Sequence, residues 1–214
     1  MSRESDEEDV LNYALYLVDL PGFGQSDLMS WDDFKAILLT QLPEQFAVLG
    51  WSMGGLYAMR LALEVPDRVS HLMGIASSPY CIQASQWPGI QKSAFEDFVV
   101  SLLSTPEDTV EKFLRLQTNH KTLLSEPLNP KRLLGLAQGL QVLLNWDFRD
   151  ALLDYVKPSC FLFGRHDAII PVKTMAVMKA RYPHFEYHLF QDAAHLPFVS
   201  HRDDFLRILR GFVR

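Results

Sequence analysis

The sequence lacks the features that mark several large classes of protein. Cys81 and Cys160 are the two cysteines in 214 residues, which are too few for a disulfide framework and form no CxxC pair. No apolar run reaches the ~20 residues that cross a bilayer. Residues 1–10 are acidic and contain no apolar core of the kind found in signal peptides. We therefore expect a cytoplasmic protein that does not associate with membranes.

The chain also lacks an excess of positive charge. Its formal net charge is −6, and residues 1–9 alone contribute −4, because they contain five acids and Arg3. We interpret this acidic start as a solvated chain end. Nucleic acid is therefore not an expected partner. Without an HExxH motif or a Cys/His cluster in the sequence, we expect no metal and no cofactor, and we expect a monomer.

Apolar runs alternate with helical patterns over most of the chain, which predicts an α/β fold with a mainly parallel sheet of about five strands. The expected strands are 13–18, 46–50, 69–76, 161–164 and 185–190. The expected helices between and after them are 31–42, 54–64, 172–181 and 203–213. Ser30 is the expected N-cap of the first helix.

Residues 81–146 do not follow this alternation. Their patterns are helical, at 94–103, 106–116 and 130–144. We interpret the segment as a helical cap inserted into a core made of residues 1–80 and 147–214, because insertions of this size usually cover a functional site. The alternative is a helical embellishment without a function of its own.

The clearest chemical motif is Gly-Trp-Ser-Met-Gly-Gly at residues 50–55, between an expected strand and an expected helix. In that context G-x-S-x-G is a nucleophile elbow, whose sharp turn requires small residues two positions before and after the serine. We expect Ser52 to be the nucleophile. The backbone N–H of Met53 is the expected oxyanion donor, at a helix N-terminus that favours developing negative charge.

A serine hydroxyl needs a general base, and the base needs an acid that orients it. Asp167 and His195 each follow an expected strand, and they occur in the order serine, acid, histidine that is typical of this elbow. We expect Asp167 to orient His195. Asp192 is the nearest alternative acid, and Asp147 and Asp150 are also possible.

Further motifs make the sequence resemble the α/β-hydrolases, and most closely the pimeloyl-[acyl-carrier protein] methyl ester esterase family of biotin biosynthesis. The residues that carry the resemblance are GWSMGG at 50–55, PDRV at 66–69, AAHLPF at 193–198, DLPGFGQS at 19–26, ASSP at 76–79, WPGI at 87–90, FLRLQT at 113–118 and HLPFVSH at 195–201. The resemblance implies a serine carboxylesterase that hydrolyses the methyl ester of a pimeloyl chain carried by acyl-carrier protein.

Two alternatives remain beside this reading. The elbow, acid and histidine do not determine the acyl group, so a general short-chain carboxylesterase would have the same motifs. A catalytically impaired homologue that acts as a binding protein is the second alternative. It is suggested because such hydrolases place strands and a His-Gly oxyanion loop before the segment that corresponds to 13–19, where this chain has about a dozen residues and no His-Gly. We therefore expect an N-terminally truncated or rearranged sheet, and an oxyanion hole with one of its two backbone donors.

The expected cap contains both apolar and basic residues. We expect Trp51, Phe113 and Leu116 to bind substrate, although apolar helix faces are more often simply core. The sequence between residues 112 and 132 contains five basic residues and a single acidic one, Glu126. Acyl-carrier protein is acidic, so these residues are candidates for its docking by electrostatic steering; the alternative is an ordinary solvated helix face. The five are Lys112, Arg115, Lys121, Lys131 and Arg132.

Overall fold

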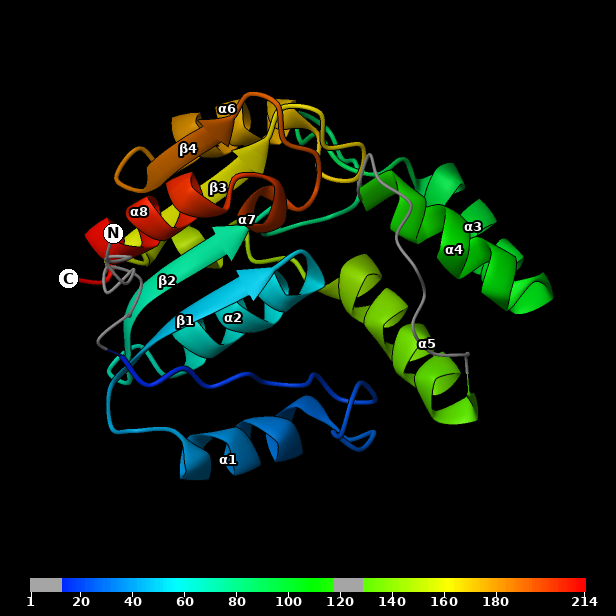
Figure 1. The fold of residues 1–214 in the computed structure, drawn as a ribbon, viewed down its shortest axis with the longest axis horizontal. Coiled ribbons are helices and arrows are strands. Elements are labelled where there is room, and N and C mark those ends of the chain that lie inside the picture. The colour runs from blue at the N-terminus through cyan, green and yellow to red at the C-terminus, as the bar shows by residue number, and fades with distance from the viewer. Residues whose placement is uncertain (1–12, 118–128) are drawn as a thin grey trace, which may run out of the picture.

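The computed structural model describes residues 13–117 and 129–214, and within them it contains a four-stranded parallel sheet (Figure 1). The strands are β1 (Phe46–Trp51), β2 (Val69–Ile75), β3 (Ser159–Gly164) and β4 (Glu186–Phe190). They lie in the order β1-β2-β3-β4, and each neighbouring pair is parallel. This arrangement confirms the predicted α/β class with a mainly parallel sheet.

Each face of the sheet is covered by helices, and each face has its own apolar core. Alternate residues of a strand point to opposite faces, so Phe161 and Phe163 join one core and Cys160 and Leu162 the other. The first core also contains residues of α1 (Trp31–Gln41), α2 (Met53–Glu64) and α6 (Val172–Arg181); the second contains residues of α8 (Arg202–Phe212). A sheet that is buried on both faces explains the nearly continuous apolar runs of β2 and β3.

The predicted helices are present within one or two residues of their expected ends. The Ser30 side chain accepts a hydrogen bond from the Asp33 amide, which confirms the predicted N-cap of α1. Two short elements were not predicted: the 3-10 helix η2 (Ala151–Asp154) and the single-turn helix α7 (Pro197–Ser200). Such short elements carry no periodic signal in the sequence.

The prediction of a strand at residues 13–18 is wrong. This segment forms no ladder with the sheet (Figure 1). Leu17 is 89% exposed and Leu15 is 74% exposed, so the apolar residues that suggested a buried strand have no core to enter. The described sheet therefore has four strands, and β1 is one of its two edges.

The segment 13–18 lies beside β1 without pairing with it. Both line a single hollow of about 1460 Å³. In the described sheet, the outer edge of β1 is therefore left without a neighbouring strand.

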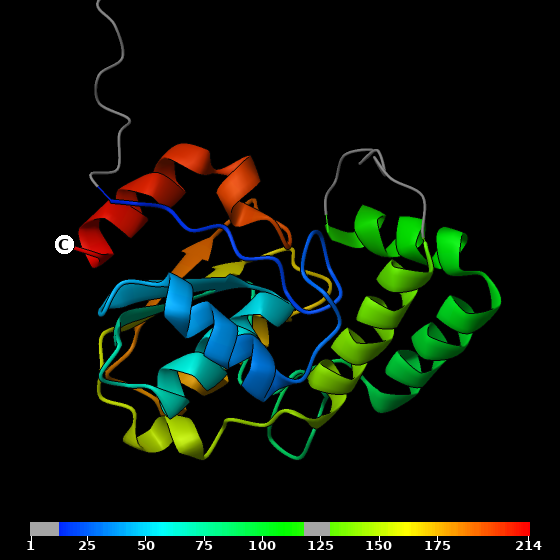
Figure 2. The same ribbon diagram turned by 90° about the horizontal axis from the view of Figure 1, so that it is seen from below.

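A lobe of three helices stands beyond the carboxyl ends of β1 and β2 (Figures 1 and 2). It consists of α3 (Lys92–Ser104), α4 (Pro106–Gln117) and α5 (Pro130–Asn145), which confirms the helices predicted there. The division into a core and a cap at residues 81 and 146 remains our interpretation. Among the residues described, no helix is long and apolar enough to span a membrane.

Candidate active site

Ser52 occupies a strained turn between β1 and α2. Its backbone has φ 53° and ψ −122°, a conformation that non-glycine residues rarely adopt. Three hydrogen bonds hold it there: the Ser52 amide donates to the Ile75 carbonyl at 2.8 Å, and the Ser52 carbonyl accepts from the Gly55 amide at 2.9 Å and from the Ser77 hydroxyl at 2.8 Å. Strain that the surroundings maintain in this way is typical of functional sites.

The glycines of the motif meet different steric demands. A Cβ on Gly50 would lie 2.2 Å from the Gly54 carbonyl oxygen, and a Cβ on Gly55 would lie 2.1 Å from the Ser77 hydroxyl oxygen. A Cβ on Gly54, in contrast, would meet no heavy atom within 4 Å. We had assigned the requirement for small residues to Gly50 and Gly54. The structure confirms it at Gly50 and adds Gly55, which packs against Ser77, while outside its own helix nothing crowds Gly54.

Asp167 and His195 meet at the carboxyl ends of β3 and β4. The Nδ1 atom of His195 lies 2.8 Å from Oδ2 of Asp167, and both side chains are fully buried. The other carboxylate oxygen of Asp167 accepts hydrogen bonds from the Ile169 and Ile170 amides at 2.8 and 2.9 Å. Because an ionised carboxylate can only accept, Nδ1 carries the proton and a neutral imidazole has its lone pair on Nε2.

The Nε2 atom of His195 is buried and has no hydrogen-bond partner among the residues described. A buried polar atom without a partner costs free energy, which is tolerated most readily where the atom has a function. The described structure therefore contains no hydrogen bond between this ring nitrogen and the Ser52 hydroxyl. In apo active sites, the hydrogen bonds of catalytic residues are often long or poorly aligned and tighten only when substrate binds.

Two further contacts bring the histidine loop to the elbow. The Trp51 indole N–H donates to the His195 carbonyl at 2.8 Å, which ties the residue before Ser52 to the candidate base. A Cβ on Gly164 would lie 2.0 Å from the Ala194 carbonyl oxygen, so a glycine at the end of β3 lets this loop approach. Sequence reasoning missed both contacts. The glycine at the strand end was the only signal for either.

The alternative acids have other environments. Asp147 forms an ion pair with Arg149 at 2.7 Å, and Asp150 forms one with Arg181. Asp192 is exposed. Of the four acids considered, Asp167 is therefore the one that the structure places against His195.

The residues predicted to bind substrate share the large hollow with the elbow. Trp51, Ser52 and Met53 line it at the end of β1, and Phe113 and Leu116 line it from α4. The N–H of Met53 belongs to the first turn of α2, where backbone amides have no partner within the helix. The hollow also extends along the outer edge of β1, so its full volume is larger than a site at Ser52 alone.

The predicted docking residues are distributed over the lobe, and two of them are paired with acids. Arg115 forms an ion pair with Glu111 on α4, and Lys131 forms one with Asp27 at 3.2 Å. Lys112 is exposed, and Arg132 is partly buried and lines the hollow. Lys121 lies outside the described residues, as does Glu126. The local excess of positive charge is thus smaller than the sequence window suggested.

The structure also brings together one group of side chains of metal-binding type within the described ranges: Cys160, Glu186 and His188. Their positions near the start of β3 and in the first half of β4 are remote along the strands from Asp167 and His195. Sequence spacing did not indicate this group, because its members come from two strands separated by a helix.

A strained serine between strand and helix, a buried aspartate–histidine pair after two later strands and a parallel sheet define the class of serine hydrolases with an α/β core. The α/β hydrolase family matches residues 3–208, and the chain belongs to it.

Among curated proteins, the chain is 48% identical over 202 residues to the pimeloyl-[acyl-carrier protein] methyl ester esterase of Legionella pneumophila strain Paris, covering 94% of this chain and 84% of that protein. It is 37% identical over 218 residues to the protein of that name from Aliivibrio salmonicida, covering 94% and 82%.

Solved structures show the same fold. An esterase from Exiguobacterium antarcticum superposes with a TM-score of 0.76 at 21% identity, covering 90% of this chain and 78% of that one. A bromoperoxidase from Bacillus anthracis superposes with a TM-score of 0.75, also at 21% identity and the same coverage. At these identities the likeness concerns the fold alone.

Proposed function

We propose that this protein is a serine carboxylesterase that hydrolyses the methyl ester of a pimeloyl chain carried by acyl-carrier protein, as a step in biotin biosynthesis. The single observation that carries the chemical part is the buried Asp167–His195 pair, whose second imidazole nitrogen has no hydrogen-bond partner among the described residues. The substrate part rests on the names of relatives that are up to 48% identical to this chain.

The reaction has two halves. In the first, His195 Nε2 takes the proton of the Ser52 hydroxyl while the serine oxygen attacks the ester carbonyl carbon. The Met53 amide stabilises the oxyanion, and His195 then returns the proton to the departing methoxide, which leaves as methanol. In the second half, water attacks the acyl-enzyme with the same base, and the free carboxylate is released together with the Ser52 hydroxyl.

Asp167 orients the imidazole in this scheme and stabilises its charged form. Its second oxygen is held by two backbone amides, so the carboxylate cannot rotate freely. We assign one oxyanion donor, the Met53 amide, and no second one. Loss of one of two donors typically lowers the rate by about 10²–10³.

The lobe above the elbow supports a long acyl substrate. Phe95, Phe98 and Phe113 line the hollow together with Ser52, so apolar side chains of the lobe border the same space as the elbow. Lys112 is the strongest candidate for steering an acidic carrier protein, because it is exposed on α4, whereas Arg115 and Lys131 are offset by Glu111 and Asp27. We also place the protein in the cytoplasm, in agreement with two free, buried cysteines.

The proposal is tested by comparing two substrates: p-nitrophenyl acetate and the methyl ester of pimeloyl-[acyl-carrier protein]. The wild type should hydrolyse both, and His195→Ala should abolish both activities. His201→Ala, a histidine six residues later that contacts Ser200, is the matched control and should keep them. Turnover of the small ester alone would favour the general short-chain esterase, and turnover of neither would favour the impaired binding homologue.

Carrier docking has its own test. Charge reversal of Lys112 should reduce turnover of the carrier-bound ester and leave the small ester unaffected. The carrier reaction should also slow as salt rises, because exposed charges are screened beyond about 8–10 Å at physiological ionic strength. An equal loss on both substrates would indicate a structural defect and contradict a docking role.

A further inference from the structure

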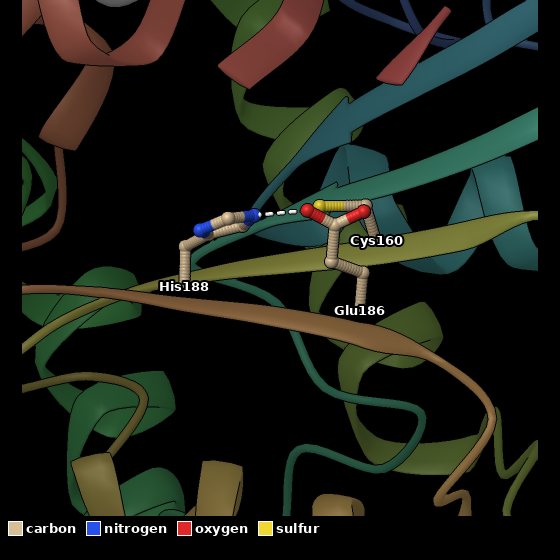
Figure 3. Close-up of side chains that lie close together, drawn as sticks. All are labelled: Cys160, Glu186 and His188. Carbon is tan, nitrogen blue, oxygen red and sulfur yellow. Dashed lines mark hydrogen bonds and ion pairs between the residues drawn. The ribbon is translucent and has the colours of Figure 1, made fainter. Parts of the chain in front are cut away.

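Three side chains of metal-binding type meet on one face of the sheet (Figure 3). Cys160 comes from β3, and Glu186 and His188 come from β4. The strand register pairs Cys160 with Glu186 and Leu162 with His188, so all three side chains project from the same face. One ligand atom from each residue lies within 4.8 Å of the other two.

We propose that Cys160, Glu186 and His188 bind one Zn²⁺ ion, with water as the fourth ligand. Zinc accepts sulfur, nitrogen and oxygen ligands in a tetrahedral arrangement, whereas magnesium and calcium avoid thiolates. Zinc–ligand bonds of about 2.0–2.3 Å place tetrahedral ligand atoms about 3.3–3.6 Å apart. The three ligand atoms lie within 4.8 Å of one another, so changes of about 1 Å bring them to this separation.

Small side-chain rotations complete the geometry. Nε2 of His188 now lies 2.5 Å from Oε1 of Glu186, and the ion would separate them by about 1 Å. Both side chains can move, because His188 is 32% exposed and Glu186 is 51% exposed. Cys160 is fully buried beneath them, so the ion would enter from the side of the two exposed ligands.

The charges at the site balance. The carboxylate of Glu186 and a thiolate of Cys160 together neutralise a divalent cation, with His188 as a neutral ligand. Burial, assisted by the charge of Glu186, raises the pKa of the Cys160 thiol to about 12. The thiol is therefore protonated before binding, and the ion displaces that proton to solvent.

The site has a structural consequence rather than a catalytic one. It lies toward the amino-terminal ends of β3 and β4, whereas Asp167 and His195 follow the carboxyl ends of the same strands. β4 is an edge of the described sheet. A bound ion would tie this edge strand to β3 and stabilise the folded protein through its binding free energy.

The test uses the full-length protein without an affinity tag, stripped of metal with EDTA and dialysed. Calorimetric titration with ZnCl₂ should show one equivalent bound, and the thermal midpoint should rise with zinc and return with EDTA. Co²⁺ in place of zinc should give a thiolate-to-cobalt charge-transfer band. Cys160→Ala should remove that band, and His188→Gln should weaken zinc binding by about tenfold or more.

Matched controls exist for both ligands. Cys81→Ala changes the other buried cysteine, and His184→Gln changes a histidine that instead contacts the Tyr155 carbonyl. Both should bind zinc like the wild type. Because His188 is partly exposed, its variant should fold even if Cys160→Ala does not.

Absence of saturable zinc binding would overturn the proposal, as would an unchanged affinity in His188→Gln. Zinc should leave the rate of p-nitrophenyl acetate hydrolysis unchanged. A zinc-dependent loss of that activity that persists in His188→Gln would place the ion at the Ser52–His195 end and also overturn the proposal.

Discussion

Asp167 and His195 lie buried and hydrogen-bonded at the carboxyl ends of β3 and β4, while the apolar segment 13–18 lies largely exposed beside β1. Both regions were marked in the sequence by their residue types. The polar pair is positioned because two neighbouring parallel strands, β3 and β4, end next to each other. The apolar segment forms no ladder with the sheet, so its composition alone does not make it a strand. The difference shows that an apolar run does not by itself produce a paired strand, even beside the open edge of β1.

The largest effect is expected from the polar pair. Asp167→Asn keeps the shape of the side chain but removes the acceptor that fixes the proton on Nδ1 of His195. We expect kcat for p-nitrophenyl acetate to fall by about 10⁴, the size of effect seen when such an acid is replaced by its amide. Asp192→Asn is the matched control, because Asp192 is exposed and only three residues from His195. A comparable loss in the control would move the orienting role to Asp192.

A pair of leucines tests the contrast between the two regions directly. Leu162 on β3 is fully buried, and Leu17 is 89% exposed. Leu162→Ala should lower the free energy of unfolding by about 2–5 kcal/mol, whereas Leu17→Ala should change it by less than about 0.5 kcal/mol. Urea unfolding of the two variants measures both values. A large cost at Leu17 would mean that segment 13–18 packs against the sheet in solution.

The elbow contains two glycines that also differ in packing: Gly50 lies against backbone atoms, and Gly54 faces open space. Gly50→Ala would place a Cβ 2.2 Å from backbone, so the turn must shift. We expect a loss of stability of about 1–3 kcal/mol. Gly54→Ala meets open space within α2, and since alanine favours helix by up to about 1 kcal/mol, this variant should be neutral or slightly more stable. Equal costs at both positions would contradict the assignment of close packing to Gly50.

Apart from the control variants, the smallest effect is expected at Glu64, whose side chain holds the start of α1. Its carboxylate accepts hydrogen bonds from Trp31 at 2.8 Å, Lys35 at 2.5 Å and Arg60 at 2.8 Å. Burial opposes the ionised form, but these three hydrogen bonds outweigh it and lower the pKa of Glu64 to about 2. Glu64→Gln should lower the free energy of unfolding by about 1 kcal/mol at pH 7, discounted for partial exposure.

The pH dependence of the stability difference between wild type and Glu64→Gln follows from the direction of the Glu64 pKa shift. A carboxyl group whose pKa is lower in the folded state stabilises the fold above its unfolded pKa, about 4.3. That stabilisation is lost as the pH falls toward 2. The difference in thermal midpoint between wild type and Glu64→Gln should therefore be largest at pH 7. It should shrink as the pH falls below about 4. A gap that is independent of pH would show that packing rather than charge is lost.

The sequence by itself determined the class of fold, the helices and the chemical identity of the candidate site. Helical periodicity, caps such as Ser30 and the order of Ser52, Asp167 and His195 are local or sequential properties, so they can be read without coordinates. The α/β hydrolase class rests on these features, and the family match agrees with it.

Tertiary structure alone decided what depends on neighbours distant in the chain. It left residues 13–18 unpaired, added a steric demand at Gly55 through Ser77, and offset two basic residues with Glu111 and Asp27. It also selected Asp167 over the other acids and gathered Cys160, Glu186 and His188 across two strands. In each case the deciding contact joins side chains or strands whose separation is set by strand register and packing, which no local pattern encodes.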